Sequence, residues 1–175
     1  MSPDHGMRQV RIIGDGCAAL SLAARADDLA GHQLTLVRPE GAPQETDHIW
    51  GFWDGPELAA ASRLARKRWH SWSIVTGQGQ VVLQSGGRPY TALHRLDWTS
   101  HCRSAAARAG VEIRAGNETA KTGDLVFDSR PPPVPEGMML QHFLGLEVRS
   151  RHEIFDPDTA ILMDFRVDQS RGMHF

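Results

Sequence analysis

Residues 9–19 read QVRIIGDGCAA, and this stretch decides the fold. The β-branched run 9–13 predicts a short buried strand that ends at a glycine. Residues 14–19 then form the pattern G-x-G-x-x-A, in which the first glycine permits a tight turn. The second glycine leaves room for a diphosphate to approach the backbone, and the small sixth residue lets a helix pack close to the strand. The candidate dinucleotide-binding residues of this turn are Gly14, Asp15, Gly16, Cys17, Ala18 and Ala19.

A helix and a second strand are expected directly after the turn. Alanines and leucines at helical spacing run from Cys17 to Leu29, and Gly31 is a typical helix stop. The run 33–37 (QLTLV) predicts a strand, which Pro39 prevents from continuing. Strand, glycine turn, helix and strand within about thirty residues predict a βαβ unit with a parallel strand pair and a right-handed crossover.

The residue that should recognise the adenosine ribose departs from the usual pattern. An acid is expected about twenty residues after the turn, at the end of the second strand. Arg38 stands there instead, and Glu40 lies two residues further along. Two interpretations follow: Arg38 accommodates a 2′-phosphate, which favours NADP over FAD, or Pro39 turns the chain so that Glu40 takes the place of the acid.

The remainder of the chain predicts a mixed set of helices and short strands. A loop over 41–54 ends in the aromatic cluster IWGFWD, and Pro56 begins a predicted helix that runs to Trp72. A second helix is expected over 97–109, with Asp97 as its cap. Short strands are expected at 81–83 and around Tyr90, forming a hairpin about Gly86-Gly87, and at 111–113 and 125–127.

The pattern changes to a period of two after the proline-rich turn 131–135. Apolar residues alternate with other residues over 142–149 and again over 161–168. This alternation predicts two half-exposed antiparallel strands, joined across the turn-forming residues 156–158. We interpret them as the beginning of a second sheet.

Composition excludes several classes of function. A formal charge of -2 provides no positive field for holding a nucleic acid. Cys17 and Cys102 lie far apart, so they predict neither a disulfide framework nor a zinc site but a reducing, cytoplasmic location. No apolar stretch approaches the roughly 18 residues that span a bilayer. Any membrane contact is therefore expected to be peripheral, at the inner face.

Two charged groups allow a functional and a plain interpretation. Arg63, Arg66, Lys67 and Arg68, with Trp69 and Trp72, give the predicted helix a basic end that would either rest on an anionic bilayer or simply stabilise a helix C-terminus. We favour the second interpretation. Asp156, Asp158, Asp164 and Asp168 lack the spacing of a calcium loop, so no metal site is expected.

Four segments in order resemble the lycopene cyclase family of flavoproteins: the glycine turn, HIWGFWDG at 48–55, LVFDSRP at 125–131, and the long stretch 141–169. The last is the most specific, because so long a run in the right order is unlikely by chance. The resemblance implies an α/β fold with a glutathione-reductase-like FAD/NAD(P)-binding Rossmann domain over 1–135. It also implies that 136–175 begins an antiparallel substrate-domain sheet.

The resemblance further implies a non-redox reaction of the isomerase or intramolecular lyase class. An acid protonates a terminal double bond of lycopene or a related carotenoid, and the cation closes to a ring. FAD, with NAD(P)H as its reductant, is the implied cofactor. The chain ends at Phe175, before the family's acidic motif, so we assign no catalytic residue and expect the fragment alone to be inactive.

Further site residues are expected at a strand end and in the aromatic cluster. Asp128 ends the strand beside the expected cofactor position, where ligands of parallel sheets bind, or has an ordinary loop role. Trp50, Phe52 and Trp53 either line a pocket that stabilises a carbocation or pack in the core. Two rival functions are another FAD-dependent oxidoreductase (a hydroxylase or a polyprenoid reductase) and a truncated chain without turnover.

Overall fold

The computed structural model describes residues 7–42, 46–117, 125–139 and 143–175. The chain divides into two compact units, one made of residues 1–48 and 95–138 and the other of residues 49–94 and 139–175. This division differs from the expected one at residue 135, because residues 49–94 group with the C-terminal segment. The second unit is therefore built from two separate stretches of the chain.

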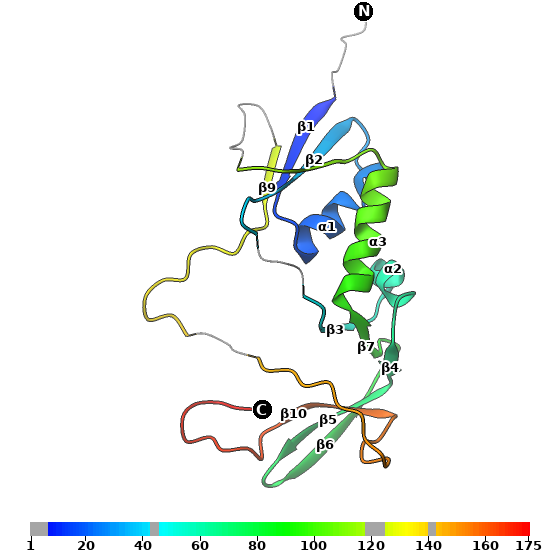
Figure 1. Cartoon of the computed structure of the whole chain (residues 1–175). Helices are drawn as coiled ribbons and strands as arrows, with labels where there is room; N and C mark the ends of the chain where they lie inside the picture. The colour runs from blue at the N-terminus through cyan, green and yellow to red at the C-terminus, as the bar shows by residue number, and fades with distance from the viewer. Residues whose placement is uncertain (1–6, 43–45, 118–124, 140–142) are drawn as a thin grey trace, which may run out of the picture. The chain divides into compact units, whose positions relative to one another are not determined.

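The first unit contains a parallel sheet with the strand order β8-β2-β1-β9. Strand β1 spans Arg8–Ile13 and pairs in parallel with β2 (His32–Arg38) on one side and with β9 (Leu125–Asp128) on the other. Strand β8 (Glu112–Ala115) pairs in parallel with β2. The predicted parallel strand pair is confirmed, and the ends of β1, β2 and β9 meet at one edge of this sheet (Figure 1).

Two helices cover one face of this sheet (Figure 1). Helix α1 spans Cys17–Ala23, and helix α3 spans Arg95–Arg108. The sheet contributes alternate residues to the shared core, because side chains two positions apart on a strand face the same way. That core contains Val10, Ile12, Leu34 and Leu36 from the strands, Ala19, Leu20, Ala23, Cys102 and Ala106 from the helices, and Val111.

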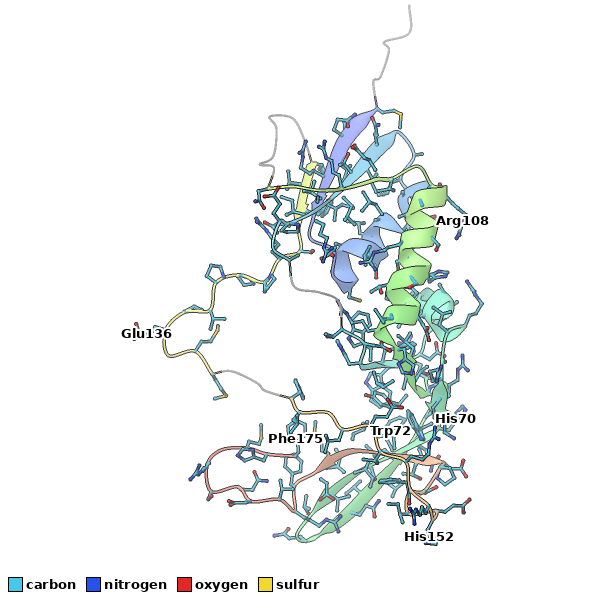
Figure 2. The ribbon with its side chains drawn as sticks, in the orientation of Figure 1. His70, Trp72, Arg108, Glu136, His152 and Phe175 are labelled. Carbon is cyan, nitrogen blue, oxygen red and sulfur yellow. The ribbon has the colours of Figure 1, made fainter. Side chains whose placement is uncertain are left out.

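The first helix is shorter than the sequence predicts. It ends at Ala23, and residues Ala26–Asp28 form a separate 3-10 turn, η1, before β2 begins. Helix α3 agrees closely with the prediction. Its last residue, Arg108, lies at the carboxyl end of the helix, where a cation is favourable (Figure 2).

The second unit contains two three-stranded sheets, with the orders β3-β7-β4 and β10-β5-β6. Strands β3 (Ile49–Trp53) and β4 (Lys67–Trp69) both pair antiparallel with β7 (Tyr90–His94). Strands β5 (Ser71–Thr76) and β6 (Gly79–Gln84) form a hairpin that closes at Gly77-Gln78. The hairpin predicted about Gly86-Gly87 is therefore displaced.

The predicted helix over 56–72 is wrong. Its first residues form a 3-10 turn, η2 (Pro56–Leu58), and a short helix, α2 (Ala59–Ser62), but Lys67–Trp69 and Ser71–Thr76 are strands. The apolar spacing of three and four residues was compatible with a helix, yet pairing with distant strands overrides this local preference. Of the basic residues 63–68, Arg63 caps the short helix α2, whereas Lys67 and Arg68 belong to strand β4.

The predicted antiparallel pair at the C-terminus is also wrong. Residue 142 lies outside the described residues, and 143–158, all of them described, contain no strand. Strand β10 (Thr159–Asp164) does form, but it pairs in parallel with β5. The alternating apolar side chains of 143–148 do not pack on a sheet, since Leu144 and Leu146 are 91% and 80% exposed.

The protein thus has a mixed α/β fold with a parallel sheet. Among the residues that the structure describes, none belongs to a helix with the length and apolar character needed to cross a membrane.

Candidate functional site

The glycine turn joins β1 to α1 at the edge of the parallel sheet where strand ends meet. The backbone N–H of Gly14 donates to the carbonyl of Val37 at 2.9 Å, which ties the turn to the end of β2. Gly14 has a φ of 115°, a backbone conformation that favours glycine. Gly14 has no side chain, and the hydroxyl of Ser129 occupies the space where a Cβ on residue 14 would lie.

Gly16 differs from Gly14 in its surroundings. A Cβ added to Gly16 would meet no atom within 4 Å, so the backbone there faces open space. Cys17 follows at the start of α1 and is exposed, whereas Ala19 is 1% exposed and packs in the core. The turn therefore has one closed side and one open side, and the open side has the access that a diphosphate requires.

A cavity of about 500 Å³ lies beside the turn, within the first unit. This volume falls in the range of small-molecule sites in proteins. The walls combine apolar side chains with one carboxylate and two guanidinium groups. The lining residues are Asp15, Leu20, Leu36, Arg38, Leu96, Arg103 and Ile113.

The carboxylate of Asp15 lies close to both guanidinium groups of this cavity. The Nε of Arg38 lies 2.8 Å from Oδ2 of Asp15, and an Nη of Arg103 lies 3.9 Å from the same oxygen. Arg38 comes from the end of β2 and Arg103 from the middle of α3. The sequence did not single out Arg103, because a lone arginine on a helix has no distinguishing pattern.

Glu40 does not line the cavity. Its carboxylate accepts a hydrogen bond from Nδ2 of Asn117 at 3.0 Å, and its backbone N–H donates to Oδ1 of Asn117 at 3.1 Å. Both contacts connect Glu40 to the segment just after β8. Of the two residues that the sequence proposed at the adenosine end, Arg38 is therefore the one beside the turn.

Asp128 ends β9 at the same edge of the sheet but is engaged by its neighbour. Arg130 donates to both oxygens of Asp128 through Nε and Nη2, at 2.9 and 2.6 Å. These hydrogen bonds lower the pKa of Asp128 from 3.8 to about 2. The next residue, Ser129, contacts the glycine turn directly, and its hydroxyl donates to the carbonyl of Ile13 at 2.9 Å.

The aromatic residues of 50–53 lie in the second unit on strand β3. Trp50 and Phe52 are partly buried, while Trp53 is 44% exposed. Trp53 packs against Trp72 of β5 with ring centroids 4.4 Å apart, and against Tyr90 at 5.0 Å. Figure 2 labels Trp72 at this position among the strands.

A second cavity, of about 610 Å³, lies within the second unit. Trp69 and Tyr90 line it, with ring centroids 6.1 Å apart, and Phe155 adds a third aromatic side chain. The expected residues Trp50, Phe52 and Trp53 do not line this cavity. The remaining lining residues are Gln80, Val82, Ile154, Asp156, Thr159, Ala160, Ile161 and Leu162.

The acidic residues near the C-terminus make local contacts. The carboxylate of Asp156 accepts from the N–H of Asp158 at 2.8 Å, as expected of a turn-forming residue. Arg166 donates to both oxygens of Asp164, at 2.8 and 2.6 Å, and this lowers the pKa of Asp164 to about 2. Among the described residues, no group of His, Cys, Asp and Glu side chains has the arrangement of a metal site.

Three solved structures are similar to part of this chain. An alanine mutant of 2-methyl-3-hydroxypyridine-5-carboxylic acid oxygenase matches with a TM-score of 0.50 and 17% identity, over 62% of this chain and 31% of that chain. CtdE in complex with FAD and a substrate matches with a TM-score of 0.46 and 20% identity, over 62% and 30%. A flavoprotein/dehydrogenase from Cytophaga hutchinsonii matches with a TM-score of 0.42 and 18% identity, over 61% and 30%. The chain spans about a third of the length of these proteins.

A comparison with curated proteins finds no match. The model of the family described as lycopene cyclase protein, in contrast, matches residues 9–175, from the first residue of the quoted stretch to the last residue of the chain. The chain belongs to the lycopene cyclase protein family.

Proposed function

We propose that this chain binds FAD at the glycine turn and serves as the flavin- and polyene-binding part of a lycopene cyclase. The observation that carries the proposal is the open side of Gly16 next to a cavity of about 500 Å³ at the strand ends. Family membership and a parallel sheet with this turn at its edge support it.

The first unit fits the adenosine half of FAD. The backbone at Gly16 is open to a diphosphate, and no side chain contact would have to be displaced there. Leu96 and Ile113 supply apolar wall area for an adenine ring. The glutathione-reductase-like arrangement implied by the family resemblance would place the diphosphate against the start of α1.

The second cavity fits an apolar, unsaturated chain. Trp69, Tyr90 and Phe155 present aromatic side chains, and ring faces stabilise a cation by about 0.5–2 kcal/mol each. Ring closure of lycopene passes through a carbocation, so an aromatic pocket suits both the substrate and the charge that develops on it. This assignment replaces the expected cluster of Trp50, Phe52 and Trp53.

Asp156 contributes a negative charge to the same cavity. The backbone N–H of Asp158 donates to its carboxylate, and this hydrogen bond holds the pKa of Asp156 below its ordinary value. Asp156 is therefore ionised at neutral pH, which suits it to attract a cation and makes it a poor proton donor. No described residue is assigned as the acid that protonates the polyene.

Bound FAD, kept reduced by NAD(P)H, would supply cation stabilisation or proton transfer. The chain's own part is to hold the dinucleotide at the turn and the polyene between aromatic rings. Ala160 and Leu162 are half-buried and add apolar wall area to the cavity, where a cation would be less exposed to quenching by water.

The proposal is tested by flavin titration and by product analysis. FAD binding is measured first, so that the proposed FAD binding is tested separately from turnover. The protein is then incubated with lycopene, FAD and NADPH, in one sample anaerobically and in another under air, and the product mass is determined in each. A ring product has the mass of lycopene, whereas a hydroxylase adds oxygen and a reductase adds hydrogen. A changed mass would contradict the cyclase assignment. Unconverted lycopene is the result expected of this chain by itself, for which no proton-donating acid is assigned, and FAD binding then decides the proposal.

A further inference from the structure

The pair formed by Asp15 and Arg38 has a feature that the sequence pattern alone did not suggest. Dinucleotide-binding folds of this kind use an acid at the end of the second strand to accept hydrogen bonds from the adenosine ribose. Here the strand end carries Arg38, and the carboxylate of Asp15 lies against its guanidinium at 2.8 Å. An acid is thus present at the end of β2, although it belongs to the turn.

We propose that Asp15 is the ribose acceptor of this site and that Arg38 and Arg103 are its positioning residues. This inference rests on the proposed function, because it assigns the part of the dinucleotide that the cavity recognises. The ligand chemistry is an unmodified ribose diol, as in FAD, and a ribose that carries a 2′-phosphate is disfavoured.

The charges around the cavity support this assignment. The two guanidinium groups both approach Oδ2 of Asp15, at 2.8 and 3.9 Å, and come from different elements. Both guanidinium groups therefore attract the Asp15 carboxylate and hold it at the cavity wall. Hydroxyl groups of a ribose can donate to this carboxylate, and such charge-assisted hydrogen bonds are strong.

A 2′-phosphate would meet a less favourable arrangement. It would need the position between Arg38 and Arg103 that Asp15 holds, and two negative groups would then face each other across a few ångströms. Removal of the Asp15 carboxylate would leave two guanidinium groups on one cavity wall, which is the geometry that binds phosphate well. The same cavity would therefore change from a diol site to a phosphate site.

Glu40 provides a matched control. It is the other acid that the sequence placed near the end of β2, but its carboxylate is bound to Asn117 and does not line the cavity. A substitution of Glu40 removes one negative charge from the same neighbourhood without changing the cluster of Asp15, Arg38 and Arg103.

The experiment compares two probes, ADP-ribose and 2′-phospho-ADP-ribose, by isothermal titration calorimetry on the whole 175-residue chain. The wild-type protein should bind ADP-ribose about tenfold more tightly than 2′-phospho-ADP-ribose. Asp15→Ala should weaken ADP-ribose binding about tenfold and strengthen binding of the 2′-phosphate compound, so that the order of affinities inverts. Asp15→Asn should act in the same direction, and Glu40→Ala should leave both affinities unchanged.

Three outcomes would overturn the inference. The first is a wild-type preference for the 2′-phosphate compound, and the second is the same inversion in Glu40→Ala. The third is an unchanged ratio in both Asp15 variants with their thermal unfolding intact. If the wild-type chain binds FAD in any of these cases, the inference fails and the proposed function stands. If it binds neither FAD nor either probe, the proposed function fails with it.

Discussion

The hydroxyl of Ser129 occupies the space that a side chain on Gly14 would need. Ser129 follows β9 directly, and its hydrogen bond to the carbonyl of Ile13 fixes it at the end of β1. The first glycine of the turn is therefore required by a residue more than a hundred positions away in sequence, while the second faces open space. This difference separates the structural part of the turn from the part that is free for a ligand.

The two glycines should respond differently to alanine. Gly14→Ala places a Cβ against Ser129 and forces an L-residue into a φ of 115°, so the free energy of unfolding should fall by about 2 kcal/mol or more. Gly16 has a φ of -77° and no neighbour to displace. Gly16→Ala should therefore change the free energy of unfolding by roughly 0.5 kcal/mol or less. Urea unfolding measures both, and equal losses would contradict the two-sided description of the turn.

The parts of the fold that the sequence predicts are those that local patterns determine. Val10, Ile12, Leu34 and Leu36 alternate along two short runs, and the glycine turn between them leaves a parallel pair as the compact solution. Residues 67–72 were mistaken for the end of a helix because their apolar spacing fits both periods. Only the distant partner strands β6 and β7 decide in favour of strands.

The candidate site shows the same limit. Asp15 and Arg38 were identified from the motif, since both have defined positions within it. Arg103, Asn117 and Ser129 were missed because they reach the turn and the end of β2 from other elements. Asn117 lies 77 residues from Glu40, and Ser129 lies 116 residues from Ile13. No local pattern encodes such contacts, so they become visible only when the sheet is assembled.

The Asp128–Arg130 pair predicts a specific titration. The hydrogen bonds from Arg130 lower the pKa of Asp128 to about 2 from 3.8. A depressed carboxyl pKa contributes stability above about pH 3.8, and this contribution is lost as the pH falls toward 2. In Arg130→Ala the pKa of Asp128 should return toward 3.8, as followed by carboxyl-carbon NMR. Arg166→Ala is the control, since it should raise the pKa of Asp164 and leave that of Asp128 unchanged.

The two cysteines should differ strongly in reactivity. Cys17 is exposed at the start of α1, whereas Cys102 is fully buried, and burial raises the pKa of its thiol to about 11. Since the thiolate is the reactive form, iodoacetamide should label Cys17 in the native protein and Cys102 only after unfolding. Bound FAD should protect Cys17, which follows Gly16 directly. Mass spectrometry of Cys17→Ser provides the control, and native labelling of Cys102 would contradict the described core.

The aromatic cavity of the second unit can be tested with two phenylalanines. Phe155 lines the cavity, whereas Phe143 does not, and both side chains are largely exposed. Phe155→Ala should weaken polyene binding about fivefold to tenfold, which corresponds to roughly 1–1.4 kcal/mol of lost apolar contact. Phe143→Ala should leave it unchanged. Quenching of tryptophan fluorescence by lycopene reports both, and an equal effect of the two substitutions would exclude this cavity as the polyene site.

The central claim is that the backbone at Gly16 receives the diphosphate of FAD. The dissociation constant of FAD, measured by flavin fluorescence for the wild type, Gly16→Ala and Gly86→Ala, tests it most directly. Gly86 also has open space around an added Cβ but lies in the second unit, so it controls for the substitution itself. We predict that Gly16→Ala weakens FAD binding at least about tenfold, or about 1.4 kcal/mol, and that Gly86→Ala leaves it unchanged. Equal FAD affinity in all three proteins, or no FAD binding to the wild type, would contradict the claim.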